Sequence, residues 1–275
     1  MSDPRLPAEM LDHIVDLLHD TKDALGNCCL VSKSWIPRTR RHLFAEMKLY
    51  VIRDMRSWTA TFPDPANSPA RYTKTLYIGS HIVTASDLEV EGWIRGFSSV
   101  VDLAFGSQRL FACESFSLIP FRGFSPVKSL RMTFAALPSP WIFNLILLFP
   151  LLEDLDVIIS HNASVDGGDD SDWPLAANQP SSPPMLSGSL KLYLKGGMKP
   201  FTRRLLSLPG GIHFRKLTLT WLREEDLLTV TALVEECSPT LESLDITCNF
   251  CMFIWHLRPH RQLTSASRRV EVRFY

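Results

Sequence analysis

Short apolar-x-apolar triplets recur along this chain at an almost constant spacing. Nine of them begin between residues 49 and 270, and successive first positions differ by 27, 27, 27, 25, 37, 25, 27 and 26 residues. Chance triplets in a leucine-rich chain would scatter in spacing, so a period near 26 predicts a stacked array of similar units. The triplets span 49–51, 76–78, 103–105, 130–132, 155–157, 192–194, 217–219, 244–246 and 270–272.

Helix-sized segments separate several of these triplets, at 86–97, 140–149, 200–208 and 224–237. In the last of them, the predicted apolar side consists of Leu227, Leu228, Val230, Leu233 and Val234. A strand followed by a helix, repeated many times, indicates parallel strands with the helices packed outside. We therefore expect an α/β fold.

The fullest repeat has Leu241, Leu244, Ile246, Asn249 and Cys251 at the spacing L-x-x-L-x-L-x-x-N-x-C. This pattern resembles the leucine-rich repeat, which implies an irregular solenoid of parallel strands over residues 46–275. Another α/β or α+β arrangement remains the alternative. The one long interval contains an acidic run at 166–172 and a Pro-Ser segment at 180–184, which predicts an insertion in the solenoid at about 160–187.

The first 45 residues have a different, helical pattern. Pro7 suits the first turn of a helix, and Met10, Ile14 and Leu17 follow at helical spacing on one stripe. A polar break at 20–23 is able to cap a second helix, which we expect to close at Trp35. A module this small hides little of its own surface, so its apolar stripe requires another surface to cover it.

The Leu-Pro start, the apolar stripe and the closing Val-Ser-x-x-Trp resemble an F-box, the module that docks substrate receptors onto a ubiquitin ligase scaffold. The resemblance implies that the helical module at 1–45 binds a Skp-type adaptor protein and, through it, a cullin scaffold. It also implies which residues contact the adaptor or hold the helices that do so: Leu6, Pro7, Met10, Ile14, Leu30, Val31 and Trp35. An unrelated N-terminal helical hairpin is the alternative.

Charge and hydropathy exclude some other functions. Lys plus Arg and Asp plus Glu number 29 each, so no overall field favours nucleic acid or an anionic membrane. The longest apolar run, 141–152, is too short to span a bilayer, and the N-terminus lacks the apolar region of a secretory signal. We expect a soluble protein of the cytoplasm or nucleus, with its six cysteines reduced.

Catalytic and metal-binding patterns are weak. The sequence contains no nucleophile elbow, phosphate-binding loop, dinucleotide fingerprint or zincin motif, so we expect no enzyme and no cofactor. Cys248, Cys251, His256 and His260 are zinc-type ligands at short spacing, but two of them fall in the turn of the best repeat, which favours a structural role without metal. Several arginines lie near the C-terminus, and we interpret them as solvent-exposed side chains at the end of the chain.

In a leucine-rich solenoid the middle residue of each triplet faces away from the core. The expected target-binding residues are therefore Tyr50, Tyr77, Arg131, Asp156, Tyr193, Thr218 and Asp245. The first hypothesis is a substrate receptor of a cullin-type ubiquitin ligase, which holds an unknown target protein near the ubiquitin-carrying enzyme. The second is a ligase-independent interaction scaffold whose helices cap the solenoid. A hydrolase or transferase hidden in an α/β fold is a third, which no motif supports.

Overall fold

The computed structural model describes residues 7–81, 94, 96–106, 121, 123–124, 126–134, 141–159, 184–194, 198–208, 210–223, 226–248 and 269–274 of the chain. The described helices are α1 (Ala8–Leu17), α2 (Lys22–Val31), α3 (Ile36–Leu43), α4 (Ile52–Thr61), α6 (Trp141–Leu147), α7 (Met198–Leu206) and α8 (Leu227–Cys237), with a 3-10 turn η1 (Pro69–Tyr72). The described strands are β1 (Glu46–Val51), β2 (Thr75–His81), β3 (Asp102–Gly106), β4 (Ser129–Phe134), β5 (Asp154–Ile159), β6 (Ser189–Leu194), β7 (Lys216–Leu222), β8 (Ser243–Cys248) and β9 (Arg269–Phe274).

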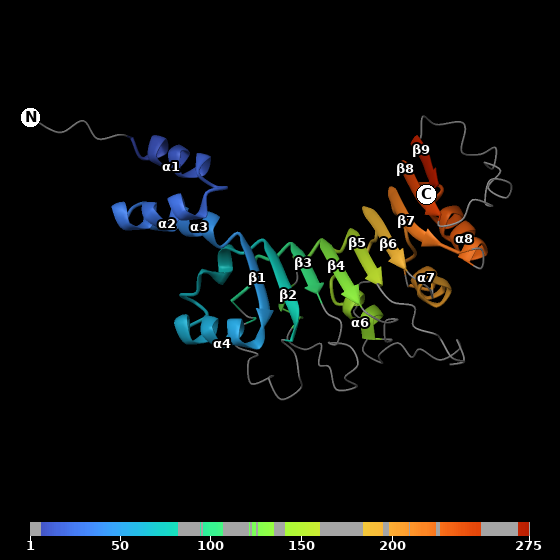
Figure 1. Ribbon diagram of the computed structural model, residues 1–275, viewed down its shortest axis with the longest axis horizontal. Helices are drawn as coiled ribbons and strands as arrows, with labels where there is room; N and C mark the ends of the chain where they lie inside the picture. Colours follow the sequence, from blue (N-terminus) through green and yellow to red (C-terminus); the bar gives the residue numbers. More distant parts are fainter. Residues whose placement is uncertain are drawn as a thin grey trace, which may run out of the picture.

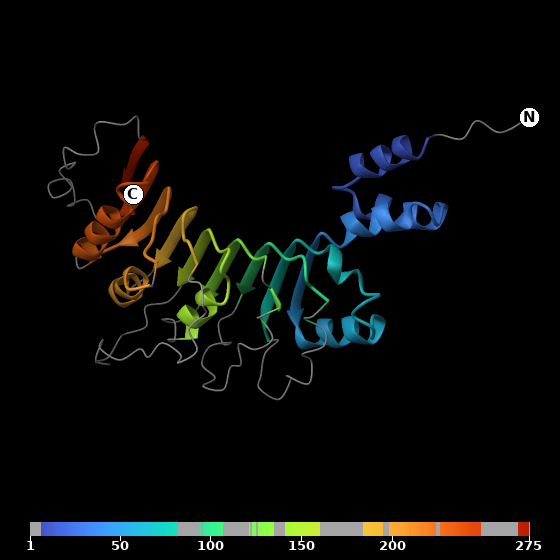
Figure 2. The same cartoon turned by 180° about the vertical axis from the view of Figure 1, so that it is seen from behind.

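The nine strands form one sheet in which each strand pairs, in parallel, with its neighbours in the chain. Figure 1 shows that the sheet is curved, with α1–α3 beyond β1 at one end and β9 at the other. Figure 2, from behind, shows α4, α6, α7 and α8 on the convex side. The predicted α/β class and parallel strands are thus confirmed.

The core lies between the sheet and the outer helices. Burial alternates along the strands, as in β5, where Leu155, Val157 and Ile159 are buried and the residues between them are partly exposed. Large rings such as Phe143 on α6 and Phe201 on α7 fill the space behind the strands, with centroids 5.2 Å apart. Parallel strands joined by helices bury one face in this way because the crossover segment must return along that face.

A repeated backbone contact sets the start of most strands. The carbonyl of Lys74 accepts hydrogen bonds from the N–H groups of Val101 at 2.8 Å and Asp102 at 3.0 Å. The carbonyl of Val101 accepts from Lys128 and Ser129 in the same way. At most of these junctions the residue before one strand therefore holds the first residues of the next strand through the backbone alone, whereas at β6 the Asp154 carboxylate takes part by accepting from the N–H of Ser189.

The N-terminal unit has three helices where the sequence predicted two. Pro7 precedes α1, and its carbonyl accepts from the N–H groups of Met10 at 3.1 Å and Leu11 at 3.2 Å. The prediction that Trp35 closes the second helix is wrong, because α2 ends at Val31 and extended Ser32 follows it. Trp35 instead precedes α3, with Pro37 in its first turn, where the missing N–H costs no hydrogen bond.

A further helix, α4, follows β1 directly and lay in no predicted segment. The Asp54 carboxylate accepts hydrogen bonds from the N–H groups of Tyr50 at 2.8 Å and Val51 at 3.0 Å, which turns the chain into α4. Helices α6, α7 and α8 lie at the predicted segments 140–149, 200–208 and 224–237 to within a few residues. Leu228 was placed on the apolar side of the last one, but it is exposed, because it lies on the solvent side of α8.

Several expectations fall outside the described residues. Most of the predicted helix at 86–97 does so, as do most of the insertion at about 160–187 and the zinc-type ligands Cys251, His256 and His260. In the described part, Cys28, Cys29 and Cys237 are free thiols. Burial raises the pKa of the Cys237 thiol to about 11, so this thiol is neutral near pH 7 and unreactive.

Candidate functional site

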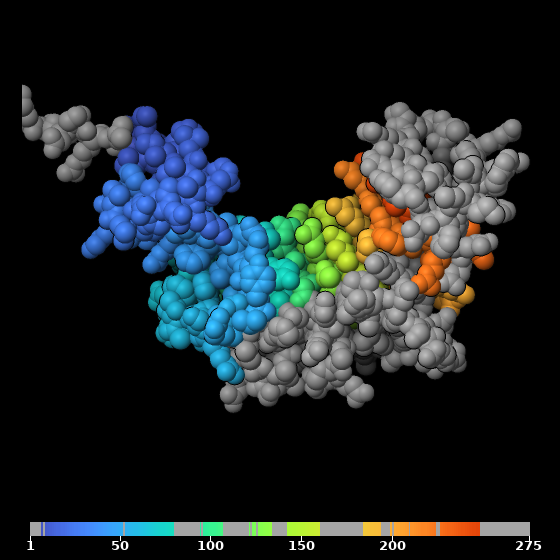
Figure 3. Space-filling model, viewed as in Figure 1, coloured from blue at the N-terminus to red at the C-terminus, as the bar shows by residue number. Residues whose placement is uncertain are grey.

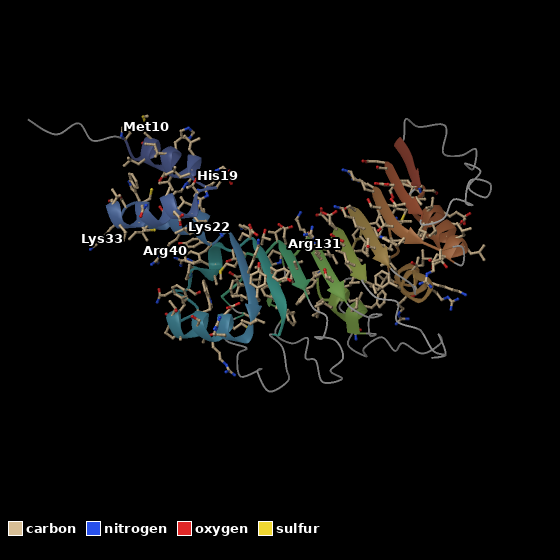
Figure 4. All side chains as sticks on the ribbon, viewed as in Figure 1. Met10, His19, Lys22, Lys33, Arg40 and Arg131 are labelled. Carbon is tan, nitrogen blue, oxygen red and sulfur yellow. The ribbon has the colours of Figure 1, made fainter. Side chains whose placement is uncertain are left out.

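Apolar side chains are exposed in unusual number on the first two helices. Among the described residues, nine large apolar side chains are exposed, and five of these lie on α1 and α2. They are Met10, Ile14 and Leu17 on α1 and Leu30 and Val31 on α2, which together we call the helical apolar patch. In Figure 4, Met10 and Lys33 both lie toward the end of the helical unit that points away from the sheet.

Helix α1 carries two apolar stripes with different surroundings. Val15 is buried and lies between the partly buried Leu11 and Leu18, one helical turn away on each side, so this stripe faces the other helices. Met10, Ile14 and Leu17 have the same spacing on the neighbouring face and remain in contact with solvent. A single inward stripe would satisfy the helical unit, so the second stripe is available for a partner.

Helix α2 also has both buried and exposed apolar side chains. Leu25 and Cys28 are buried, whereas Leu30 is 86% exposed and Val31 is 68% exposed. Leu30 and Val31 stand in the last turn of α2, just before extended Ser32. Isolated exposed leucines are common on protein surfaces, but five exposed apolar side chains on two successive helices are a concentration of the kind that marks an interaction site.

An ion-pair cluster fixes α1 against α3. The Asp16 carboxylate accepts hydrogen bonds from Arg38 Nε at 2.7 Å, from Arg38 Nη2, and from His42 Nε2 at 2.7 Å. The hydrogen bond from Arg38, followed by the one from His42, holds the pKa of Asp16 well below its usual range. The bidentate geometry orients α1, and hence the direction in which Met10, Ile14 and Leu17 point.

The helical unit keeps its own small core. Its buried residues Val15, Leu25 and Cys28 do not belong to the main apolar cluster behind the sheet, which begins at Leu49. The junction is made by Phe44, whose ring packs edge-on against Trp58 of α4 at 5.8 Å and against Phe62 at 6.3 Å. Trp58 packs in turn against the main core, so Phe44 attaches the unit to the β1 end of the sheet region.

The sequence-predicted adaptor residues are only partly brought together. Pro7, Met10, Ile14, Leu30 and Val31 are exposed on the helical unit. Trp35 is partly buried at the start of α3, and Leu6 lies outside the described residues. Leu17 was not among the predicted adaptor residues although it is exposed to 69%, and its helical spacing from Met10 and Ile14 was the signal for it.

The sheet face opposite the core forms the second candidate surface. Figure 3 shows the molecule hollowed between the N-terminal helical unit and β7–β8, and Figure 4 shows Arg131 of β4 within this hollow. Strand register places one residue of each strand in a row across the middle of the face. The row contains Lys48, Tyr77, Ala104, Arg131, Asp156, Lys191, Thr218, Asp245 and Glu271.

Five of the predicted target-binding residues, Tyr77, Arg131, Asp156, Thr218 and Asp245, occupy this row. Tyr50 and Tyr193 face the same way but stand two residues further along their strands, so the predicted register is wrong at β1 and β6. Each of these two strands contains two overlapping apolar-x-apolar triplets. In both strands it is the earlier triplet that pairs with the triplet of the neighbouring strand, with Met47 and Leu49 in β1 and Leu190 and Leu192 in β6. Whether these residues bind a target stays a prediction.

Two ion pairs connect β4 and β5 on this face, whereas the buried Asp245 Oδ1 has no hydrogen-bond partner. Arg131 Nε donates to Asp156 at 2.9 Å across β4 and β5, and Lys128 Nζ donates to Glu153 at 2.8 Å at the start of the same strands. Tyr50 and Tyr77 pack with ring centroids 5.3 Å apart at the end near the helical unit. The face thus combines aromatic rings with charges, the side chains that most often carry binding energy in protein interfaces.

In the described part of the chain, no helix has the length and apolarity needed to cross a membrane. No cluster of three or more His, Cys, Asp or Glu side chains suited to a metal ion occurs there either. No family model, curated protein or solved structure matches this chain. Its function must therefore be inferred from its own surfaces.

Proposed function

We propose that this chain is the substrate-recognition subunit of a cullin-type ubiquitin ligase. The helical unit acts as an F-box that binds a Skp-type adaptor, and the remainder is an irregular leucine-rich-repeat-like solenoid that binds a target protein. The chain performs no catalysis. Its contribution is proximity, because holding a target lysine near a ubiquitin thioester makes the transfer quasi-intramolecular.

The observation that carries the proposal is the helical apolar patch. Met10, Ile14 and Leu30 belong to the residues that the F-box resemblance assigns to adaptor contact, and all three are exposed. Burying an apolar side chain of this size contributes about 1.5–3 kcal/mol, so covering several of them supplies the free energy of a stable complex. The Asp16 cluster holds α1 in place beforehand, which reduces the ordering cost of binding.

The sequential parallel strands support the second half of the proposal. Each strand pairs with its chain neighbours, as in a repeat array, and the curved face opposite the outer helices carries Tyr, Arg, Lys and Asp side chains. The alternative role of the helices, as a cap of the array, is supported only by the contacts at the junction, such as that of Phe44 with Trp58 and Phe62. Val15, Leu25 and Cys28 are buried within the helical unit and outside the main apolar cluster.

Co-purification of the full chain with a Skp-type adaptor tests the proposal. Leu30→Asp and Ile14→Asp should each weaken adaptor binding about 100-fold or more, because a charge would be placed where an apolar contact forms. The matched control is Leu228→Asp on α8, since Leu228 is also 86% exposed but lies outside the helical unit. It should bind the adaptor as the unchanged chain does.

Circular dichroism separates loss of binding from loss of folding. Leu30 and Leu228 are both 86% exposed, so these two variants should keep the helical signal and the thermal midpoint of the unchanged chain, whereas Ile14 is 37% exposed and Ile14→Asp should lower the midpoint. The proposal is wrong if the unchanged chain does not bind the adaptor. It is also wrong if Leu30→Asp and Leu228→Asp bind equally well.

A further inference from the structure

The charge of the chain is unevenly distributed along its sequence. Residues 33–74, all of which the structure describes, contain nine Lys or Arg and three Asp or Glu, so their net formal charge is 9 − 3 = +6. Residues 1–32 contain two basic and six acidic residues, and residues 75–275 contain 18 and 20. The net positive charge of a chain that is neutral overall is therefore concentrated in one segment.

The three carboxylates of this segment already have partners within it. Glu46 pairs with Lys48 at 2.8 Å. Asp54 and Asp64 accept hydrogen bonds from groups of their own turns, which fixes the start of α4 and the loop before η1. They are therefore not the partners of the remaining basic side chains.

Four exposed basic side chains stand at the contact between α3 and η1. Arg40 and Arg41 lie in the last turn of α3, and Arg71 lies in η1, which α3 contacts directly. Lys74 follows three residues later, and its N–H donates at 2.8 Å to the carbonyl of Ala45, two residues after α3 ends. None of the four has an ion-pair partner among the described residues, and together we call them the basic surface.

The side chains of the basic surface are anchored by their neighbours. Thr39, Ala70 and Thr73, which directly precede three of them, are fully buried. The guanidinium of Arg71 lies over the ring of Tyr72, 4.9 Å from its centroid, and Nη2 donates to the Tyr72 hydroxyl at 2.9 Å. A guanidinium held on a ring keeps its other N–H groups in a fixed orientation, which lowers the ordering cost of binding a carboxylate.

The nearest carboxylates outside the segment face other directions. Arg38 donates to Asp16 of α1, whereas Arg40, two residues later, stands about 200° further round the helix. Figure 1 shows α1 and α4 on opposite sides of α3, and in Figure 4 Arg40 lies on the side toward α4. Asp102, next to Lys74, lies on the sheet face opposite the core and accepts from Thr75 at 3.3 Å. The α3–η1 side thus keeps a positive charge.

We propose that the basic surface binds a short acidic segment of a partner protein. Arginine forks pair with carboxylates through two parallel hydrogen bonds, and three of the four side chains are arginine. Nucleic acid or an anionic membrane extends well beyond this surface, and neither residues 1–32 nor residues 75–275 add net positive charge for it. A short acidic segment needs only the local charge. This inference goes beyond the proposed function and does not rest on it.

Fluorescence anisotropy of the full chain with a labelled peptide of about 12 residues, in which Glu and Ser alternate, tests the proposal. The peptide should bind at about 50 mM salt and bind more weakly at about 200 mM. Arg40→Glu combined with Arg71→Glu should weaken binding about tenfold or more. The matched control is Lys199→Glu combined with Lys216→Glu, which makes the same change of net charge at two exposed lysines elsewhere and should leave the affinity within about twofold.

Three results would overturn the proposal. One is that the peptide does not bind at low salt, and another is that both double variants lose affinity equally, because only the net charge of the chain would then matter. The third is that a deoxythymidine oligonucleotide or a vesicle containing phosphatidylserine binds this surface more tightly than the peptide does. If loss of the Tyr72 contact lowers the thermal midpoint of the first double variant, Arg40→Glu combined with Lys74→Glu replaces it, with the same expected loss.

The adaptor provides an independent readout. Adaptor binding should be unchanged by Arg40→Glu combined with Arg71→Glu, and Leu30→Asp should bind the peptide as the unchanged chain does. A chain that binds the peptide but not the adaptor would refute the ligase proposal and leave the basic surface intact. A chain that binds the adaptor but not the peptide would do the reverse.

Discussion

The phenol of Tyr77 on β2 occupies the space where a Cβ on Gly106 of β3 would stand. The ring leans along the sheet toward the ends of the strands and packs against Tyr50 with centroids 5.3 Å apart. Gly79, on the same strand as Tyr77, is restricted differently, because a Cβ there would lie 2.7 Å from the Cα of Tyr50. The two glycines thus leave room for different neighbours, one a side chain and the other a backbone.

Gly79→Ala should destabilise the protein more than Gly106→Ala. The backbone of Tyr50 is held in β1 and cannot rotate away, so we expect a loss of about 2–3 kcal/mol for Gly79→Ala, within the usual range for overpacking. The Tyr77 ring is able to swing into solvent, and alanine restricts the unfolded chain, so Gly106→Ala should stay within about 1 kcal/mol of the unchanged protein. Urea unfolding measures both, and equal losses would contradict this account of the two glycines.

The Asp16 cluster should make the stability of the helical unit depend on pH. The folded-state pKa of Asp16 is depressed, so its contribution is fully present above the unfolded-state pKa of about 3.9 and is lost as pH falls toward the folded-state value. Asp16→Asn should therefore lower the thermal midpoint at pH 7, and the difference from the unchanged chain should shrink below about pH 4.

Glu235→Gln is the control for that series. It removes one negative charge from an exposed residue of α8 and should leave the midpoint unchanged at both pH values. Asp16→Asn should also weaken adaptor binding, since α1 loses its attachment to α3 through Arg38 and His42. A pH-independent difference between Asp16→Asn and the unchanged chain would contradict the assignment of the effect to the Asp16 carboxylate.

The register of β6 predicts opposite tolerance at adjacent positions. Leu192 is buried in the main apolar cluster, so Leu192→Ala should cost about 2–5 kcal/mol through lost burial and the cavity it leaves. Lys191 is exposed in the middle row, so Lys191→Ala should change the free energy of unfolding by less than about 0.5 kcal/mol. Chemical denaturation measures both values. A large loss at Lys191 together with a small one at Leu192 would place β6 out of this register.

The periodic triplets were sufficient to locate all nine strands and their parallel pairing, because buried alternation leaves a strong pattern in the sequence. The triplets did not determine which residues of β1 and β6 pair with those of the neighbouring strands. The segment from Leu190 to Leu194 has leucine at every second position, so two alignments fit equally well, and only pairing with Leu155 and Leu217 selects one.

The sequence predicted that the first 45 residues form a helical unit, but it did not predict where the second helix ends or how the helices contact one another. The stripe of Met10, Ile14 and Leu17 is visible in the sequence, whereas the break before Trp35 depends on extended Ser32 and on tertiary contacts of α3. The pairing of Asp16 with Arg38 and His42 joins residues 22 and 26 positions apart, which no local pattern indicates.

Because each strand pairs only with its neighbours in the chain, a protein with this fold is able to evolve by changes within single units. Leu155 and Leu190 stay in register although their interval is 190 − 155 = 35 residues, against 130 − 103 = 27 between Leu103 and Leu130. Connections can thus lengthen without disturbing the ladder, and whole units can be gained or lost in the middle of the chain. Under the proposed function, new target preferences would evolve by this route while the helical unit of the first 45 residues stayed unchanged.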